Sequence, residues 1–124
     1  MSPNFHLSIG VKSIEESVGF FTKVLRAKVL HRDPSGYVNI DFFGSQITLK
    51  KNGDINPELP DFHFGANLSL SDFEELSESI FINGREFIHM EPKVWEEGTH
   101  MERKKMYLKC PTGYLVELKG YKTI

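Results

Sequence analysis

The order of structural signals occurs twice along this chain of 124 residues, and the repeat constrains the fold more than any single motif. Each half begins with a Phe-His pair, Phe5-His6 in the first half and Phe62-His63 in the second. An alternating strand pattern and a Ser-x-x-Glu helix start follow each pair, and three more strand-like runs come after the helix. Such self-similarity is typical of a duplicated supersecondary unit, so we predict an α+β fold made of two tandem βαβββ modules.

The first half contains clear local signals for each element. Residues 4–11 alternate apolar and polar side chains, as in a strand with one buried face. Ser13 and Glu16 form a capping box that starts a helix. A short strand is predicted over residues 27–31, and a hairpin over 37–43 and 46–50 with a type II′ turn at Gly44-Ser45.

The second half repeats this order. A strand is predicted over residues 62–70, followed by a helix that Ser71 caps with Glu74 and that Asn83-Gly84 ends. Residues 86–95 are predicted to form a strand, 96–103 a polar loop, and 104–109 with 114–119 a closing hairpin. We therefore expect one domain over residues 1–124, with a first module of about 1–52, a linker of about 53–60 and a second module of about 61–124.

Composition excludes several classes of function. Fifteen basic and seventeen acidic residues leave a net charge of −2, which provides no concentrated positive field for nucleic acid. No apolar run approaches the roughly 20 residues that span a bilayer, and the N-terminus lacks a secretory signal pattern. Because the single Cys110 cannot form an internal disulfide, we expect a cytoplasmic protein.

Four residues at equivalent positions of the two halves suggest a metal site. His6 corresponds to His63, and aligning the Leu-Lys pairs of the two final strands places Thr48 opposite Glu117. If the modules pack about a pseudo-twofold axis, two imidazoles and one carboxylate meet near that axis. This ligand set suits Fe(II) with open positions for substrate, and it also suits Zn, Ni, Mn or Co.

The same residues resemble the vicinal oxygen chelate superfamily, which includes glyoxalase I, extradiol dioxygenases and the fosfomycin and bleomycin resistance proteins. The similarity covers nearly the whole chain, through FHLSIGVKSIEESVGFFTKVL, HFGANLSLSDFEEL and MYLKCPTGYLVELKG. The last segment is similar to the family's closing hairpin, although Cys110 stands where an Asp is usual. The resemblance implies paired βαβββ modules around a cavity, with one divalent ion held by His6, His63 and Glu117.

One departure from the family pattern guides the choice of reaction. Glyoxalase I has a fourth ligand, Glu or Gln, at the position that aligns with Thr48, whose neutral hydroxyl is a poor replacement. Gln46 lies two residues earlier on the same face and would provide that ligand after a register shift. With three ligands, the chain resembles the dioxygenases or the metal-dependent thiol transferases more closely than true glyoxalase I.

The resemblance implies a small-molecule substrate as the partner, and it leaves the reaction and the assembly open. We place dioxygenase-like chemistry ahead of lyase or isomerase chemistry, and a non-catalytic protein that sequesters an antibiotic is a further alternative. Candidate acid–base groups are Tyr107, His100 and Tyr114. Candidate substrate-binding residues are Thr48, Gln46 and Trp95. We expect a homodimer, with the site either inside one chain or shared across two subunits.

Overall fold

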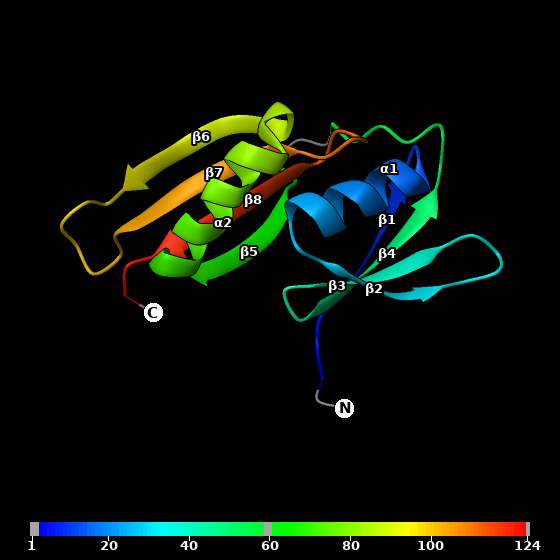
Figure 1. Ribbon diagram of the computed structural model, residues 1–124, viewed down its shortest axis with the longest axis horizontal. Coiled ribbons are helices and arrows are strands. Elements are labelled where there is room, and N and C mark those ends of the chain that lie inside the picture. Colours follow the sequence, from blue (N-terminus) through cyan, green and yellow to red (C-terminus); the bar gives the residue numbers. More distant parts are fainter. Residues whose placement is uncertain (1–2, 59–60, 124) are drawn as a thin grey trace. The chain divides into compact units, whose positions relative to one another are not determined.

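The computed structural model describes residues 3–58 and 61–123 and divides into two units, Met1–Pro57 and Glu58–Ile124. Each unit contains one strand, a helix and three further strands in that order (Figure 1). This arrangement confirms the predicted α+β class with two βαβββ modules.

The first unit is a four-stranded sheet with one helical segment. Strand β1 runs parallel to β4, and β4, β3 and β2 follow as antiparallel neighbours in the order β1-β4-β3-β2. The helix α1 continues directly into a π-helical segment, η1. The elements are β1 (His6–Val11), α1 (Ile14–Gly19), η1 (Phe20–Val24), β2 (Lys28–Arg32), β3 (Val38–Phe42) and β4 (Ser45–Lys51).

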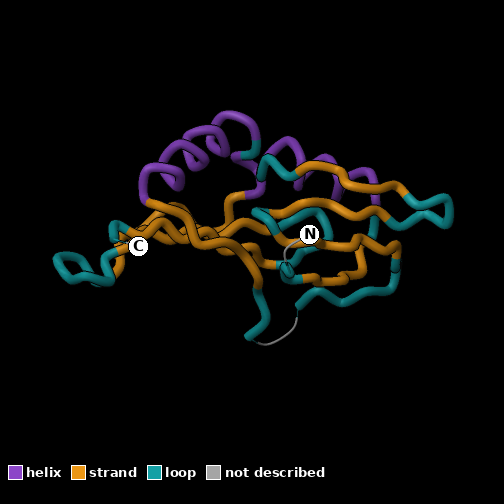
Figure 2. Tube along the Cα trace, turned by 90° about the horizontal axis from the view of Figure 1, so that it is seen from below, coloured by secondary structure: helices purple, strands orange, loops and turns teal. Residues whose placement is uncertain are grey.

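The second unit repeats this topology with a longer helix. Strand β5 runs parallel to β8, and the sheet order is β5-β8-β7-β6. Helix α2 lies on one face of this sheet and contacts β8, β5 and β7 (Figure 2). The elements are β5 (Phe64–Ser69), α2 (Leu70–Asn83), η2 (Arg85–Phe87, a 3₁₀ turn), β6 (Ile88–Trp95), β7 (Arg103–Lys109) and β8 (Leu115–Tyr121).

The helix-facing side of each sheet is apolar and buried. In the first unit, the Phe21 ring meets the Phe42 ring edge-on at 5.8 Å between centroids. In the second unit, α2 approaches β8 so closely that a Cβ on Gly120 would lie 2.3 Å from the Cβ of Phe73. Burial of one large apolar side chain contributes about 2 kcal/mol to the free energy of unfolding. Because the helix covers only one face of each sheet, the opposite face is available for polar residues.

Two local predictions were wrong. Helix α2 is capped by Ser69, whose hydroxyl accepts from the Asp72 amide, because Ser69–Asp72 forms an earlier Ser-x-x-acid pattern than Ser71–Glu74. The β3–β4 hairpin turns through Phe43-Gly44 rather than Gly44-Ser45. Both φ angles are positive, at 50° and 89°, which is the type I′ geometry that matches the twist of the paired strands.

Other predicted boundaries agree with the structure. Ser13 caps α1 and accepts a hydrogen bond from the Glu16 amide, and α2 ends at Asn83 with Gly84 as its C-cap. The β7–β8 hairpin follows the predicted segments closely. Among residues 3–58 and 61–123, no helix is long and apolar enough to cross a membrane.

Candidate metal centre in the second unit

Strand register brings Glu117 to the polar face of the second sheet. Glu117 of β8 pairs with Gly65 of β5 and with Tyr107 of β7. The pairing with β5 is very close, since a Cβ on Gly65 would lie 1.7 Å from the Glu117 carbonyl oxygen. His63 precedes Gly65 by two residues, so its side chain emerges beside the Glu117 carboxylate.

The Glu117 carboxylate is buried and surrounded by polar groups. Its side chain is 6% exposed, and its Oε1 atom lies 3.3 Å from His63 Nε2 and 3.7 Å from Lys119 Nζ. A carboxylate taken out of water requires such partners, because burying an unpaired charge is costly. His63 itself is 43% exposed, so the pair lies at the surface of this unit, where a ligand can reach it.

Tyr107 is the third side chain at this position. Its hydroxyl donates a hydrogen bond to Glu117, and its ring meets the His63 ring edge-on at 5.7 Å between centroids. Burial, followed by the hydrogen bond to Glu117 and the charge of that carboxylate, raises the pKa of Tyr107 to about 12. Tyr107 therefore stays protonated near neutral pH and holds the carboxylate as a hydrogen-bond donor.

A polar pocket of about 220 Å³ opens over these residues. Its walls come from the first residues of β5 and from the middle of β8. The lining residues are His63, Phe64, Gly65, Ala66, Asn67, Glu117 and Lys119. Imidazole nitrogen and carboxylate oxygen are ligands that Fe(II), Zn(II) and Mn(II) accept, so this pocket offers two ligands of a suitable type.

Within either unit, the described residues contain no group of three or more His, Cys, Asp and Glu side chains that could hold a metal ion. Of the three predicted ligands, the structure brings His63 and Glu117 together in the second unit. His6 begins β1 in the first unit, where it is exposed and pairs in register with Gln46. The two-His-one-Glu centre therefore stays a prediction.

The register of the first unit supports the internal correspondence. His6 precedes Ser8 by two residues, and Ser8 pairs with Thr48, just as His63 precedes Gly65, the partner of Glu117. Thr48 is buried and its hydroxyl donates a hydrogen bond to Asn39 Oδ1 at 2.7 Å. Thr48 thus occupies the place of Glu117, but its hydroxyl proton is already used within the sheet.

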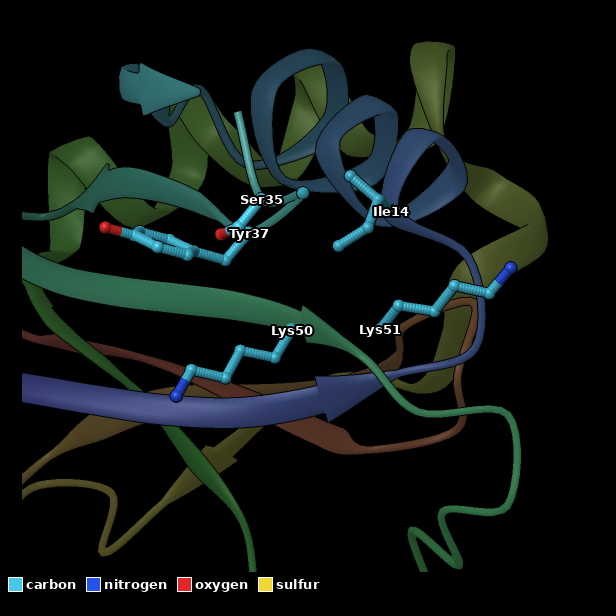
Figure 3. A pocket seen from close by; sticks show the side chains of 6 residues that line it. Ile14, Ser35, Tyr37, Lys50 and Lys51 are labelled. Atoms are coloured by element: carbon cyan, nitrogen blue, oxygen red, sulfur yellow. The ribbon is translucent and has the colours of Figure 1, made fainter. Parts of the chain in front are cut away.

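The larger cavity of the first unit has a different character. It encloses about 520 Å³ between the start of α1, the β2–β3 turn and the end of β4, where Figure 3 shows Ile14, Tyr37, Lys50 and Lys51. The ammonium groups of the two lysines point away from one another. None of its lining residues is a His, Cys, Asp or Glu, which are the side chains that most often bind metal ions.

Comparison with solved structures finds this fold in other proteins. A glyoxalase/bleomycin resistance protein/dioxygenase from Alicyclobacillus acidocaldarius matches with a TM-score of 0.81 at 25% identity, over 96% of this chain and 91% of that one. The fosfomycin resistance protein FosX from Listeria monocytogenes matches with a TM-score of 0.78 at 15% identity, over 97% and 93%. The fold is that of the vicinal oxygen chelate superfamily.

Further solved structures share this fold. TioX from Micromonospora sp. ML1 matches with a TM-score of 0.73 at 13% identity, over 97% of this chain and 99% of that one. A variant of the Listeria FosX has been solved with Mn(II) and 1S,2S-dihydroxypropylphosphonic acid. No family model matches this sequence, and no curated protein matches it.

The remaining residues predicted from the vicinal oxygen chelate resemblance lie outside the pocket at Glu117. Trp95 ends β6 and is 43% exposed, and His100 is exposed in the loop between β6 and β7. Tyr114 is buried against Phe62, with 6.1 Å between ring centroids, and burial raises its pKa. Cys110 is also buried, which raises the pKa of its thiol.

Two lysines at this face, Lys119 and Lys105, are not among the site residues predicted from the sequence. Lys119 lines the pocket, and Lys105 pairs with it in register. The sequence pattern that could have identified them is the strand period of two, because residues two apart on a strand share a face. Lys119 follows Glu117 by two residues, and Lys105 precedes Tyr107 by two.

Proposed function

We propose that this protein is a metal-dependent enzyme of the vicinal oxygen chelate type that acts on a small molecule with adjacent oxygens. The observation behind the proposal is the buried Glu117 carboxylate, which faces the His63 imidazole in an open polar pocket. A carboxylate buried at a pocket floor, with a histidine beside it, is a typical arrangement of metal ligands.

His6 is the proposed third ligand. It occupies in the first unit the register position that His63 occupies in the second, and its side chain is exposed. With His63 and Glu117 it completes a facial set that suits one divalent ion, Fe(II) first and Zn, Ni, Mn or Co as alternatives. We further propose that the protein forms a homodimer. The His6 ligand of the metal centre then comes either from the same chain as His63 and Glu117 or from the partner subunit.

Dioxygenase-like chemistry is the specific reaction proposed. Thr48 holds the register position that Glu117 holds in the second unit, and a neutral hydroxyl there in place of a carboxylate supports a three-ligand centre over the four-ligand centre of a glyoxalase. When bound, the metal would polarise the adjacent oxygens of the substrate as a Lewis acid. Tyr107 would orient Glu117 through its hydrogen bond, and His63 would be held against the Tyr107 ring.

Metal analysis of purified variants tests the ligand set. Wild type is expected to bind one divalent ion per chain, while His63→Ala, Glu117→Gln and His6→Ala each bind it at least about tenfold more weakly. His89→Ala is the matched control, because His89 is an exposed histidine on β6. The metal-enzyme proposal fails if wild type binds no divalent ion, or if the three ligand variants bind as well as His89→Ala does.

The identity of the bound metal selects the activity assay. Iron would be followed by a test for catechol-dependent oxygen uptake, and zinc or nickel by a test on the glutathione hemithioacetal of methylglyoxal. Mixing His6→Ala with Glu117→Gln examines the assembly. A site shared across a dimer regains metal binding in the mixture, because one of its two sites then has all its ligands, whereas a site inside one chain does not.

A further inference from the structure

Three lysines lie side by side across the polar face of the second sheet. Lys93 of β6 pairs with Lys105 of β7, and Lys105 pairs with Lys119 of β8. Asn67 of β5 completes the row as the partner of Lys119. Side chains that are directly opposite on neighbouring strands point to the same face, with Cβ atoms about 5 Å apart.

This lysine row is unfavourable for the isolated fold. Like charges placed directly opposite on adjacent strands destabilise a sheet, and here two such pairs follow one another. The chain as a whole has a net charge of −2, so the row is not a consequence of a basic composition. A local cost of this kind points to a ligand that offsets it.

The contacts of the row only partly neutralise it. The Lys105 ammonium lies 4.6 Å from the centroid of the Trp95 ring, and Lys119 Nζ lies 3.7 Å from Glu117 Oε1. If Glu117 binds a cation, less of its negative charge remains to balance Lys119. Arg103, further along β7, is paired with Glu96 at 3.0 Å and is not part of the row.

The row lies directly beside the proposed metal centre. Lys119 and Asn67 both line the pocket that contains Glu117 and His63. Along β7 and β8, the Lys105–Lys119 pair is the next pair on the same face after Tyr107–Glu117. A substrate held at Glu117 would therefore extend over the lysine row.

We propose that Lys93, Lys105 and Lys119, with the Asn67 amide, bind an oxyanion group of the substrate, so that the substrate is a small organic anion. This inference rests on the proposed function, because the bound anion is a substrate only if the protein is an enzyme. Ammonium groups in a row bind a carboxylate, phosphonate or phosphate through charge-assisted hydrogen bonds, and the exposed Trp95 ring at the end of the face offers a surface for the rest of the molecule.

Calorimetric titration of the metal-free protein with methylphosphonate tests the row, with its neutral dimethyl ester as the matched ligand. Wild type is expected to bind the anion and not the ester, and Lys105→Gln and Lys119→Gln are each expected to bind it about tenfold more weakly. Lys104→Gln is the matched control, because Lys104 is adjacent in sequence but is ion-paired with Glu74 of α2 at 2.9 Å. Trp95, the only tryptophan, provides a second readout through its fluorescence.

The outcomes separate the two proposals. Loss of binding in Lys105→Gln and Lys119→Gln but not in Lys104→Gln supports the row, even if wild type binds no metal and the metal-enzyme proposal falls. Equal binding in all three variants, equal binding of the ester, or no binding at all overturns the row, even if the metal binds. The unfolding midpoint of each variant is measured as well, and in Lys105→Gln the relief of like-charge repulsion is expected to leave it unchanged or higher at low salt. Lys119→Gln also loses the ion pair with the buried Glu117, so Lys105→Gln decides the outcome if Lys119→Gln is unfolded.

Discussion

The imidazole of His63 and the carboxylate of Glu117 lie 3.3 Å apart, although one residue precedes the first strand of the second unit and the other lies in its last strand. The β5–β8 pairing makes this approach possible, because Gly65 presents no side chain against the Glu117 backbone. The pair is the part of the proposed metal centre that a single unit contains.

A divalent metal is expected to raise the thermal unfolding midpoint of the wild type. A ligand that binds only the folded state at about 100 times its dissociation constant stabilises by about 2.7 kcal/mol. In Glu117→Gln, the amide replaces the carboxylate and weakens metal binding, so at the same metal concentration the shift should fall by about half or more. Differential scanning calorimetry, first with added metal and then with a chelator, measures the shift of the unfolding midpoint. An equal shift in wild type and Glu117→Gln would contradict the role of Glu117 as a metal ligand.

Gly120→Ala is expected to destabilise the protein by about 1–3 kcal/mol, because its Cβ would overlap that of Phe73 and push α2 from the sheet. Gly19→Ala is the matched control. Gly19 ends α1 with φ at −58° and nothing within 4 Å of an added Cβ, so alanine there should be neutral or stabilising. Chemical denaturation compares the two variants, and similar effects at both sites would count against the close α2–β8 packing.

Thr48→Val is expected to lower stability by about 1–3 kcal/mol while leaving metal affinity unchanged. The substitution keeps the shape but removes the hydroxyl that donates to Asn39 Oδ1, leaving a partly buried acceptor unsatisfied. Denaturation midpoints and metal titration measure the two effects separately. A weaker metal affinity in this variant would instead identify Thr48 as a fourth ligand.

Ser35→Ala is expected to raise the pKa of Asp33. The Ser35 hydroxyl and then its backbone amide are the main causes that lower the Asp33 pKa from 3.8 to about 2, with His31 contributing. A lowered carboxyl pKa favours the folded state above pH 3.8, and this contribution is lost as pH falls toward 2. In Ser35→Ala this contribution is smaller, and its loss is complete at a higher pH. An NMR titration of the Asp33 carboxyl measures the change, and identical curves would contradict it.

Much of the fold was predictable because its signals are local. The alternation of β1, the cap at Ser13 and the β7–β8 hairpin each depend on residues close together in the chain. The same locality explains the errors. Ser69 and Ser71 both begin a Ser-x-x-acid pattern, and Phe43 in a left-handed conformation is not suggested by its residue type.

The sequence alone determined the duplicated βαβββ order and the candidate ligands His6, His63 and Glu117. Only the tertiary structure decided which side chains meet. The His63–Glu117 approach, the Thr48–Asn39 hydrogen bond and the lysine row all depend on how separate strands pair. Pairing register is set by hydrogen bonds between distant segments, and a shift of one residue would turn each of these side chains to the opposite face.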